Sequence, residues 1–254
     1  MNCECVNGGG QQSVICVDSQ LVLEQETAIN DSVCQALALW SLWVGESITL
    51  RDCNHGWFRA RICQFDDEGV TILPFEAIDV PESPIEICVF QALPSKERFE
   101  LVLQKLTEIG VTRIVPFVSQ HSLTLGECDA GQKRSHRWPE VILKAAKQCR
   151  RGLLPELAPV KQWDDVYNEL SAWDVKILLD EQGSGWSLAD GIGSGRPTRI
   201  AIVVGPEGGF DRQEVERAQQ HGVVPVTLGN RILRTETAAI VAATLVQYIV
   251  GDYA

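Results

Sequence analysis

Two glycine-bearing turns in the last quarter of the chain hold the residue types best suited to bind a small ligand. The first turn reads GPEGGF at 205–210 and the second reads LGNRILRTETA at 228–238. Each follows a run of β-branched residues and leads into a helical pattern, which predicts a strand, a tight loop and a helix twice over. Because such loops present backbone N–H groups to a ligand, the two turns together predict a small-molecule site.

The chemistry of the first turn excludes two common nucleotide motifs. Its glycines do not have the G-x-G-x-x-G spacing of a dinucleotide-binding loop, and no Gly-Lys-Ser/Thr follows as in a phosphate loop. Pro206 removes one N–H donor. Glu207 would repel a phosphate, but it suits ribose hydroxyls or a positive centre such as the sulfonium of S-adenosylmethionine.

The second turn offers an apolar ledge beside two cations. Arg231 and Arg234 flank Ile232 and Leu233. An adenine ring fits such a ledge, since small-molecule pockets are mostly apolar with a few placed polar groups. Thr235 is expected to N-cap the final helix, whose Ala-rich face favours close packing within the domain or across a subunit interface.

The elements that must position these turns alternate between strand and helix from residue 85 onward. Such alternation predicts a parallel sheet with helices on both faces. Pro116 should place its strand at an edge or a bulge. Asp211 with Glu214 forms a capping-box pattern, and Asp164 or Asp165 is expected to cap another helix. The predicted strands are 85–93, 113–118, 175–179 and 199–204, the predicted helices 95–109, 138–150 and 164–172, and 181–197 reads as a long loop.

Residues 14–80 read as short strands and predict a small β-barrel. The expected strands are 14–17, 47–50, 57–65 and 70–74, with one helix at 31–40 capped by Asp31. The proline-rich stretch VPESP at 80–84 is typical of a domain boundary. The predicted domains are therefore 1–82, a barrel, and 83–254, an α/β domain.

Composition indicates a globular cytoplasmic protein. The 254 residues are 45% hydrophobic, and the sequence begins without a secretory pattern. The stretch Ala238 to Val250 is too short to span a bilayer. Nine cysteines without a CxxC pair favour a reducing compartment over a disulfide framework, and no metal site is expected.

Charge is distributed unevenly. The net charge is −12, and residues 1–84 hold three basic and thirteen acidic residues. Residues 132–151 carry seven basic residues against one acid, Glu140. Such runs are usually solvated helix faces. In a chain this acidic, the run also predicts a local site for nucleic-acid phosphates.

Taken together, GPEGGF and LGNRILRTETA closely resemble the bacterial 16S ribosomal RNA uridine-N3 methyltransferases of the SPOUT superfamily. LPSKERFELVLQKLTEIGV at 93–111 and RWPEVILKAAKQCRR at 137–151 also match that family. The resemblance covers 85–254 well and 1–84 poorly. Trp40 stands near the place of a family arginine, and Gln120-His121-Ser122 replaces the family's E-R-S, so the manner of RNA binding departs from the family pattern.

The resemblance implies a PUA-like N-terminal barrel that binds RNA, a SPOUT α/β domain with a deep trefoil knot, and a homodimer. It implies S-adenosyl-L-methionine as cofactor and ribosomal RNA of the small subunit as partner, with no membrane and no metal. The implied cofactor-binding residues are Leu179, Gly205, Pro206, Glu207, Gly208, Leu228, Gly229, Ile232, Leu233, Thr237 and Ala238; the implied RNA-binding residues are Lys96, Arg137, Lys144, Lys147 and Arg151.

Methylation of uridine N3 needs the loss of the N3 proton and stabilisation of the resulting charge on the pyrimidine carbonyls. Arg234 is the first candidate for that stabilisation and Arg231 the second, while Glu236 or Glu207 can accept the proton. An alternative is a catalytically silent RNA-binding or ribosome-assembly protein that keeps the knotted fold. A nucleotide- or phosphate-binding module is disfavoured, because Glu207 repels phosphate and the loop lacks a lysine.

Overall fold

The computed structural model describes residues 8–29, 34–66, 69–94, 97–130, 135–181 and 185–253. Contacts divide the chain into a larger unit, Ser83–Ile142 with Pro155–Ala254, and a smaller unit, Asn7–Glu82 with Leu143–Leu154. The division after Glu82 coincides with the expected boundary, but 143–154 was expected in the second domain. It joins the smaller unit because Leu143, Ala146 and Leu154 pack into that unit's core.

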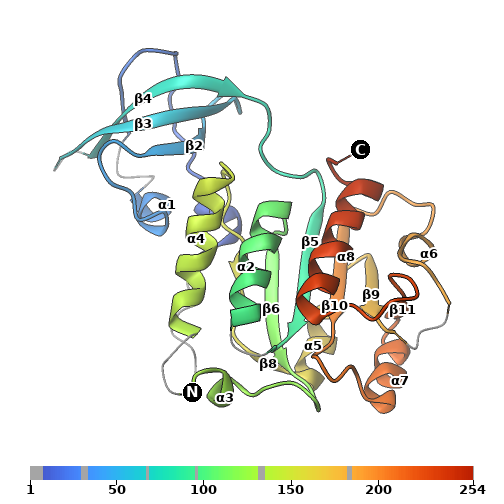
Figure 1. Ribbon diagram of the computed structural model, residues 1–254. Helices are drawn as coiled ribbons and strands as arrows, with labels where there is room; N and C mark the ends of the chain where they lie inside the picture. Colours follow the sequence, from blue (N-terminus) through green and yellow to red (C-terminus); the bar gives the residue numbers. More distant parts are fainter. Residues whose placement is uncertain are drawn as a thin grey trace. The chain divides into compact units, whose positions relative to one another are not determined.

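The larger unit is built on a seven-stranded sheet whose paired strands all run parallel (Figure 1). The order is β11-β9-β10-β5-β6-β7, with β8 also paired to β6. This confirms the parallel α/β fold. The strands are β5 (Glu86–Ala92), β6 (Arg113–Val118), β7 (Glu156–Leu157), β8 (Lys161–Gln162), β9 (Val175–Leu179), β10 (Arg199–Val204) and β11 (Val224–Val226).

Helices cover both faces of this sheet, because side chains alternate along each strand. In β5, Ile87 and Val89 belong to one core, whereas Cys88 and Phe90 belong to the other. The first core takes residues from α2 (Glu97–Ile109), α3 (Leu125–Cys128), α4 (Trp138–Gln148), α6 (Leu188–Ile192) and α8 (Thr235–Val250), and the second from α5 (Trp163–Leu170) and α7 (Arg212–Gln220). Helices α2 and α8 lie side by side (Figure 1). The short helix η3 (Ser135–Arg137) leads into α4.

Pro116 lies within the sheet, so the expectation of an edge or a bulge is wrong. β6 pairs with β5 along one side, where Pro116 stands opposite Gln91. On the other side, β7 pairs with Arg113 and Ile114, and β8 pairs with Phe117 and Val118. The ladder is therefore interrupted beside Pro116, and the missing N–H leaves no strand partner unsatisfied there.

Of three predicted helix caps in the larger unit, one is confirmed and two differ. Asp211 and Glu214 form the predicted capping box of α7. The N-cap of α5 is Gln162, two residues before the first of the expected aspartates, so Asp164 and Asp165 lie in the first turn of the helix. The N-cap of α8 is Arg234 and not Thr235, whose hydroxyl bonds outside the helix instead. The expected loop 181–197 contains α6.

The smaller unit contains a four-stranded antiparallel sheet in the order β1-β4-β3-β2. The strands are β1 (Thr27–Ile29), β2 (Ser47–Arg51), β3 (Trp57–Asp66) and β4 (Gly69–Ile78), with η1 (Gly10–Ser13) and α1 (Cys34–Leu39). The expected strand 14–17 makes a single bridge, from Cys16 to Arg51. Trp40 is buried and its indole N–H donates to the carbonyl oxygen of Ser13 at 2.7 Å. The expected cap Asp31 lies outside the described residues.

Two searches of the described residues bear on function. None of their helices has the length and apolar character needed to cross a bilayer. Nor do they contain a group of three or more His, Cys, Asp or Glu side chains placed to hold a metal ion.

Candidate functional site

A pocket of about 270 Å³ lies in the larger unit, where β9, β10 and β11 end. Ligands of open α/β sheets bind at the carboxyl ends of the strands, so its position is the one the fold favours. Three loops, the first turn of α8 and one side chain of α2 form its walls. The lining residues are Arg98, Leu179, Asp180, Glu181, Val204, Gly205, Pro206, Glu207, Gly209, Phe210, Val226, Thr227, Leu228, Gly229, Arg231, Ile232, Leu233, Arg234, Thr235 and Ala238.

The two glycine turns therefore meet around one cavity. Nine of the eleven residues predicted to bind a cofactor line it: Leu179, Gly205, Pro206, Glu207, Leu228, Gly229, Ile232, Leu233 and Ala238. Gly208 and Thr237 are not among the lining residues. A side chain at Gly208 would meet the Cβ of His121 at 3.1 Å, so this glycine permits close approach of another loop.

Local conformation explains why glycines stand in both turns. The N–H of Gly209 donates to the carbonyl oxygen of Pro206 at 3.0 Å, and Gly209 has φ +73°. Gly229 has φ +108°, and its N–H lies 3.3 Å from the hydroxyl of Thr227. Both φ values lie where glycine is favoured. The second turn then leaves Ile232 79% exposed, as an apolar ledge requires.

A buried hydrogen-bond chain joins the two turns to the centre of the sheet. The hydroxyl of Thr235 donates to the carbonyl oxygen of Gly205 at 2.6 Å. The same hydroxyl accepts from Nε2 of Gln91 at 2.9 Å, and Gln91 is fully buried in β5. The first turn, the start of α8 and β5 are thus held as one piece.

An ion-pair bridge crosses the same region. Nη1 of Arg98 lies 2.9 Å from Oε1 of Glu207, and Nε of Arg98 lies 3.8 Å from Oε1 of Glu236. Glu236 is only 8% exposed, and its Oε2 has no hydrogen-bond partner within the described part of the chain. Glu236 is absent from the pocket's lining residues, although it was predicted as a proton acceptor. No sequence pattern pointed to Arg98, because it resembles any other charged residue in a first helical turn.

The segment that leads into helix α6 contacts the start of the second turn. Ser187 forms a bridge with Thr227, and the N–H of Thr227 donates to the carbonyl oxygen of Trp186 at 2.9 Å. Ser187 and Asp190 form a capping box at the start of α6. The hydroxyl and N–H of Ser187 donate to the Asp190 carboxylate and lower its pKa. The sequence pattern predicted a loop at 181–197, so the contact between this segment and the second turn was not foreseen.

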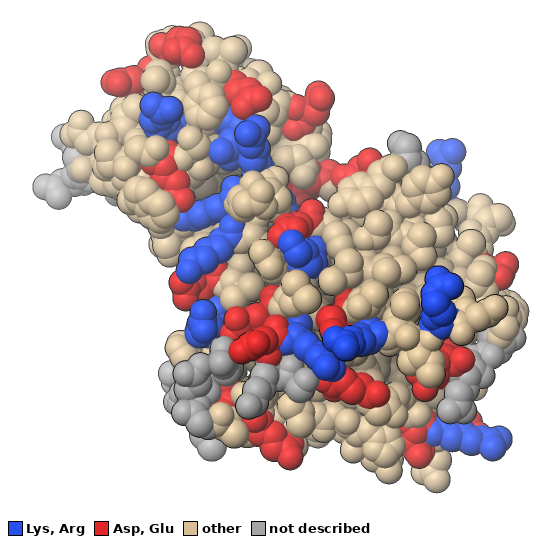
Figure 2. Space-filling view, viewed as in Figure 1, with Lys and Arg blue, Asp and Glu red and all other residues tan. Residues whose placement is uncertain are grey.

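Residues predicted to bind RNA lie in different environments. Arg137 and Lys144 are exposed, and Lys147 is half-buried with its ammonium 2.8 Å from Glu46 and 4.4 Å from the ring centre of Trp43. Lys96 lies outside the described residues. Figure 2 shows basic and acidic side chains interspersed on the visible face of each unit, without an extended basic patch there.

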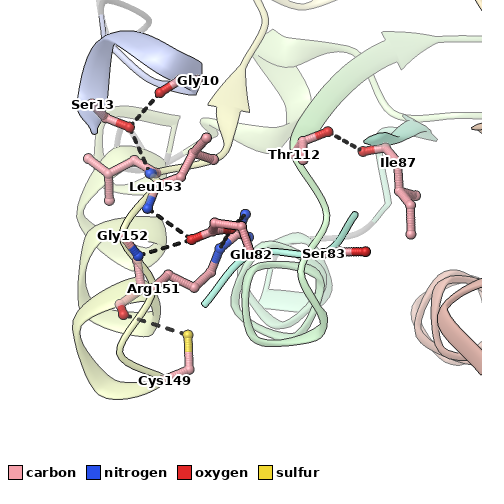
Figure 3. A network of polar contacts seen from close by, with 12 residues as sticks. Gly10, Ser13, Glu82, Ser83, Ile87, Thr112, Cys149, Arg151, Gly152 and Leu153 are labelled. Atoms are coloured by element: carbon pink, nitrogen blue, oxygen red, sulfur yellow. Dashed lines mark hydrogen bonds and ion pairs between the residues drawn. The ribbon is translucent and has the colours of Figure 1, made fainter. Parts of the chain in front are cut away.

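Arg151 differs from the prediction because it is buried. It is 4% exposed, and its Nη2 lies 2.7 Å from Oε2 of Glu82. Oε1 of Glu82 accepts from the N–H groups of Gly152 and Leu153, each at 3.0 Å (Figure 3). Arg151 therefore orders the smaller unit and presents no free guanidinium to a phosphate.

The pocket combines three features that suit a nucleoside with a positive centre. Ile232 and Leu233 supply the apolar ledge, and Arg231 and Arg234 lie beside it. Carboxylates of Asp180, Glu181 and Glu207 stand among the lining residues, where they favour hydroxyl groups and cations. Such a wall disfavours a phosphate.

Comparison with known proteins identifies relatives of the whole pocket region. A family model described as an RNA methyltransferase domain matches residues 81–247. The ribosomal RNA small subunit methyltransferase E of Bacillus subtilis is 31% identical over 66% of this chain and 67% of that protein. The Mesomycoplasma hyopneumoniae protein of the same name is 34% identical over 60% of this chain, and the match spans 65% of its length.

Two solved methyltransferase structures are similar to this chain over more of its length. The Neisseria gonorrhoeae ribosomal RNA small subunit methyltransferase E bound to S-adenosyl methionine has a TM-score of 0.69 at 28% identity, covering 94% of this chain and 98% of that one. A Legionella pneumophila structure in complex with the cofactor SAM has a TM-score of 0.67 at 30% identity, with the same coverage. The family match at 81–247 contains every residue that lines the pocket.

Proposed function

This chain belongs to the RNA methyltransferase family, and we propose that it methylates N3 of a uridine in the 16S ribosomal RNA of the small subunit, with S-adenosyl-L-methionine as methyl donor. The observation that carries the proposal is the single pocket formed by both glycine turns. Two similar structures hold the same methyl donor, at 28% and 30% identity.

The pocket residues fit that donor. Ile232 and Leu233 would contact adenine, and backbone groups of 205–209 and 228–233 would hydrogen-bond it. The carboxylates of Asp180, Glu181 and Glu207 would attract the donor's positive charge, and Glu207 would act from within the first turn. S-adenosylmethionine supplies an electrophilic methyl group on its sulfonium. In the transfer, the bond from sulfur to methyl would break as the new bond from methyl to N3 forms.

The protein's own contribution is to position the uracil and manage its proton. As the N3 proton leaves, negative charge develops on the two flanking carbonyl oxygens. Arg234 lines the pocket at the N-cap of α8, and its guanidinium would stabilise that charge, with Arg231 as the second candidate. Glu236 or Glu207 would accept the proton. Glu236 is held beside Arg98, and its second carboxylate oxygen lacks a partner in the described residues, which supports a role toward a ligand.

RNA binding in this proposal uses the exposed basic residues, Arg137 and Lys144, together with Lys147 and Lys96. Phosphate contacts of this kind position an RNA without reading its sequence. The smaller unit would act as the family's PUA-like barrel, supported by its antiparallel sheet. The proposal places the enzyme in the cytoplasm, with the small ribosomal subunits on which it would act.

The proposal includes the family's deep trefoil knot and its homodimer. The convergence of 179–181, 205–210 and 227–234 on one pocket supports the knot, because a knotted chain would bring these three segments together. The outer face of α8 supports the dimer. Leu245, Tyr248 and Ile249 are 37%, 63% and 37% exposed, and Leu101 of neighbouring α2 is 40% exposed. Apolar groups of this size in one face are typical of subunit contacts.

One experiment tests the activity directly. The protein is incubated with labelled S-adenosylmethionine and small subunits that lack the modification, and the RNA is then mapped by reverse transcription. A methyl group on N3 blocks base pairing, so a new stop at one uridine is expected, together with label in 16S RNA. A protein that binds the donor tightly yet transfers no label to naked RNA or subunits would instead be the silent RNA-binding protein.

A further inference from the structure

Arg98 is the one pocket-lining residue that comes from α2. Its guanidinium bonds to Glu207 in the first turn at 2.9 Å and approaches Glu236 in the first turn of α8 at 3.8 Å. A single side chain thereby connects three segments that are far apart in the sequence. The side chain is 35% exposed, so the bridge lies at the rim of the site and not in the core.

We propose that Arg98 is a positioning residue, a latch that holds the GPEGGF turn against α8 and so sets the affinity of the pocket for the methyl donor. This inference rests on the proposed function for the identity of the donor. The latch acts through Glu207 and Glu236, and Arg98 need not touch the reacting atoms.

Charge is the first reason why the latch is needed. Glu207 and Glu236 both lie within 4 Å of one guanidinium, so the two carboxylates are themselves neighbours. Without Arg98 they would repel each other. Glu236 is 8% exposed and one of its oxygens already lacks a partner in the described structure, so removal of Arg98 would leave a buried carboxylate poorly satisfied. The side chain of Glu207 is more exposed than that of Glu236. The turn that carries Glu207 is therefore the segment expected to move.

The second reason is that the first turn is held at two different places, its base and its tip. The hydrogen bond from Thr235 to Gly205 anchors the base of the first turn at 2.6 Å. Arg98 reaches the tip of the same turn from α2, at Glu207. Loss of Arg98 should therefore loosen 206–209 while the fold and the base of the turn persist.

The test compares Arg98→Met, Arg98→Lys, Glu207→Gln and the double variant Arg98→Met with Glu207→Gln. Arg212→Met is the matched control, because Arg212 pairs with Glu216 at 3.0 Å on α7 and does not line the pocket. Binding of S-adenosylmethionine is measured by calorimetry. Hydrogen exchange of 205–209 is measured in the protein without the donor, and thermal unfolding is recorded for every variant.

Arg98→Met should weaken donor binding about tenfold, as expected when a charged partner is removed from a poorly exposed carboxylate. It should also speed exchange at 205–209 while thermal unfolding stays cooperative, because the fold persists. Arg98→Lys should stay within about threefold of the unmodified protein, since a lysine restores one charge but not the bidentate geometry. Arg98→Met should cost less donor affinity in the Glu207→Gln background than in the unmodified protein, and Arg212→Met should bind as the unmodified protein does.

Additive losses in the double variant, or unchanged exchange at 205–209 in Arg98→Met, would overturn the latch. An unmodified protein that binds no S-adenosylmethionine would refute the proposed function, and the exchange data would still decide whether Arg98 holds the turn. The two failures are therefore distinguishable.

Discussion

The hydroxyl of Thr235 donates a 2.6 Å hydrogen bond to the carbonyl oxygen of Gly205, and so joins the first turn of α8 to the loop that follows β10. These residues belong to the two glycine turns that form the pocket. The bond explains why a threonine expected to cap its own helix does not do so. Its hydroxyl serves the tertiary contact, and Arg234 occupies the N-cap.

Thr235→Val should lower the free energy of unfolding by about 2 kcal/mol, because it leaves the carbonyl of Gly205 and one N–H of Gln91 without this partner. Valine keeps the shape of threonine, so the loss reports the hydroxyl alone. Urea unfolding measures the change. Thr235→Ser retains the hydroxyl and is the control; equal losses in the two variants would show that packing, and not the hydrogen bond, matters.

Gly191→Ala should destabilise the larger unit by about 1–3 kcal/mol through overpacking. A Cβ at Gly191 would lie 2.6 Å from Cγ1 of Val226 and 3.1 Å from Cγ2 of Ile177. Helix α6 would have to move away from β9 and β11, and Val226 lines the pocket, so donor affinity should fall as well. Gly195→Ala is the control, since the nearest side-chain atom to its Cβ is 4.0 Å away.

Ser187→Ala should raise the pKa of Asp190 toward its ordinary value, because the Ser187 hydroxyl is the largest cause of the lowered pKa. A carboxylate whose folded-state pKa is lowered stabilises the fold above its unfolded-state pKa, and this contribution disappears as the pH falls through the folded-state pKa. The variant should therefore lose stability at neutral pH but little at strongly acidic pH. Carboxyl NMR titration and unfolding at several pH values measure both effects; an Asp190 pKa that does not rise would contradict the assignment.

Arg234→Ala should abolish methyl transfer while donor affinity changes little, because the guanidinium is assigned to charge that develops on the uracil and not to the donor. Arg231→Ala is the parallel variant and should retain more activity. Single-turnover transfer and calorimetric binding separate the two steps. Unchanged turnover in Arg234→Ala would remove this residue from the catalytic role.

Arg151 and Lys144 should respond in opposite ways, although both were predicted to bind RNA. Arg151→Met should lower the free energy of unfolding of the smaller unit by about 3 kcal/mol. The substitution removes the cation that pairs with Glu82 and leaves this largely buried carboxylate without its ion-pair partner. Lys144→Met, on the exposed face of α4, should weaken RNA binding with a stability change within about 0.5 kcal/mol. Denaturant unfolding and RNA titration at fixed salt distinguish them; the reverse pattern would return Arg151 to the RNA-binding set.

Local sequence determined the elements of the site. Glycines with positive φ stand in both turns, the capping box of Asp211 and Glu214 begins α7, and the apolar run at 85–93 becomes a strand buried on both faces. These features depend on neighbours within a few residues along the chain. For that reason the sequence by itself predicted the parallel α/β fold and the two glycine turns, while the resemblance to a known family implied nine of the residues that line the pocket.

Tertiary structure decided what each polar side chain does. Arg98 finds Glu207, Thr235 finds Gly205, and Arg151 finds Glu82, and each partner lies far away in the sequence. Pro116 is tolerated inside the sheet because β7 and β8 leave a gap beside it. A charge or a hydroxyl has the same appearance in a sequence whether it faces water or a distant partner. Only the folded chain brings the partners within hydrogen-bonding distance, and this distance determines whether the group binds a ligand, positions a loop or stabilises the core.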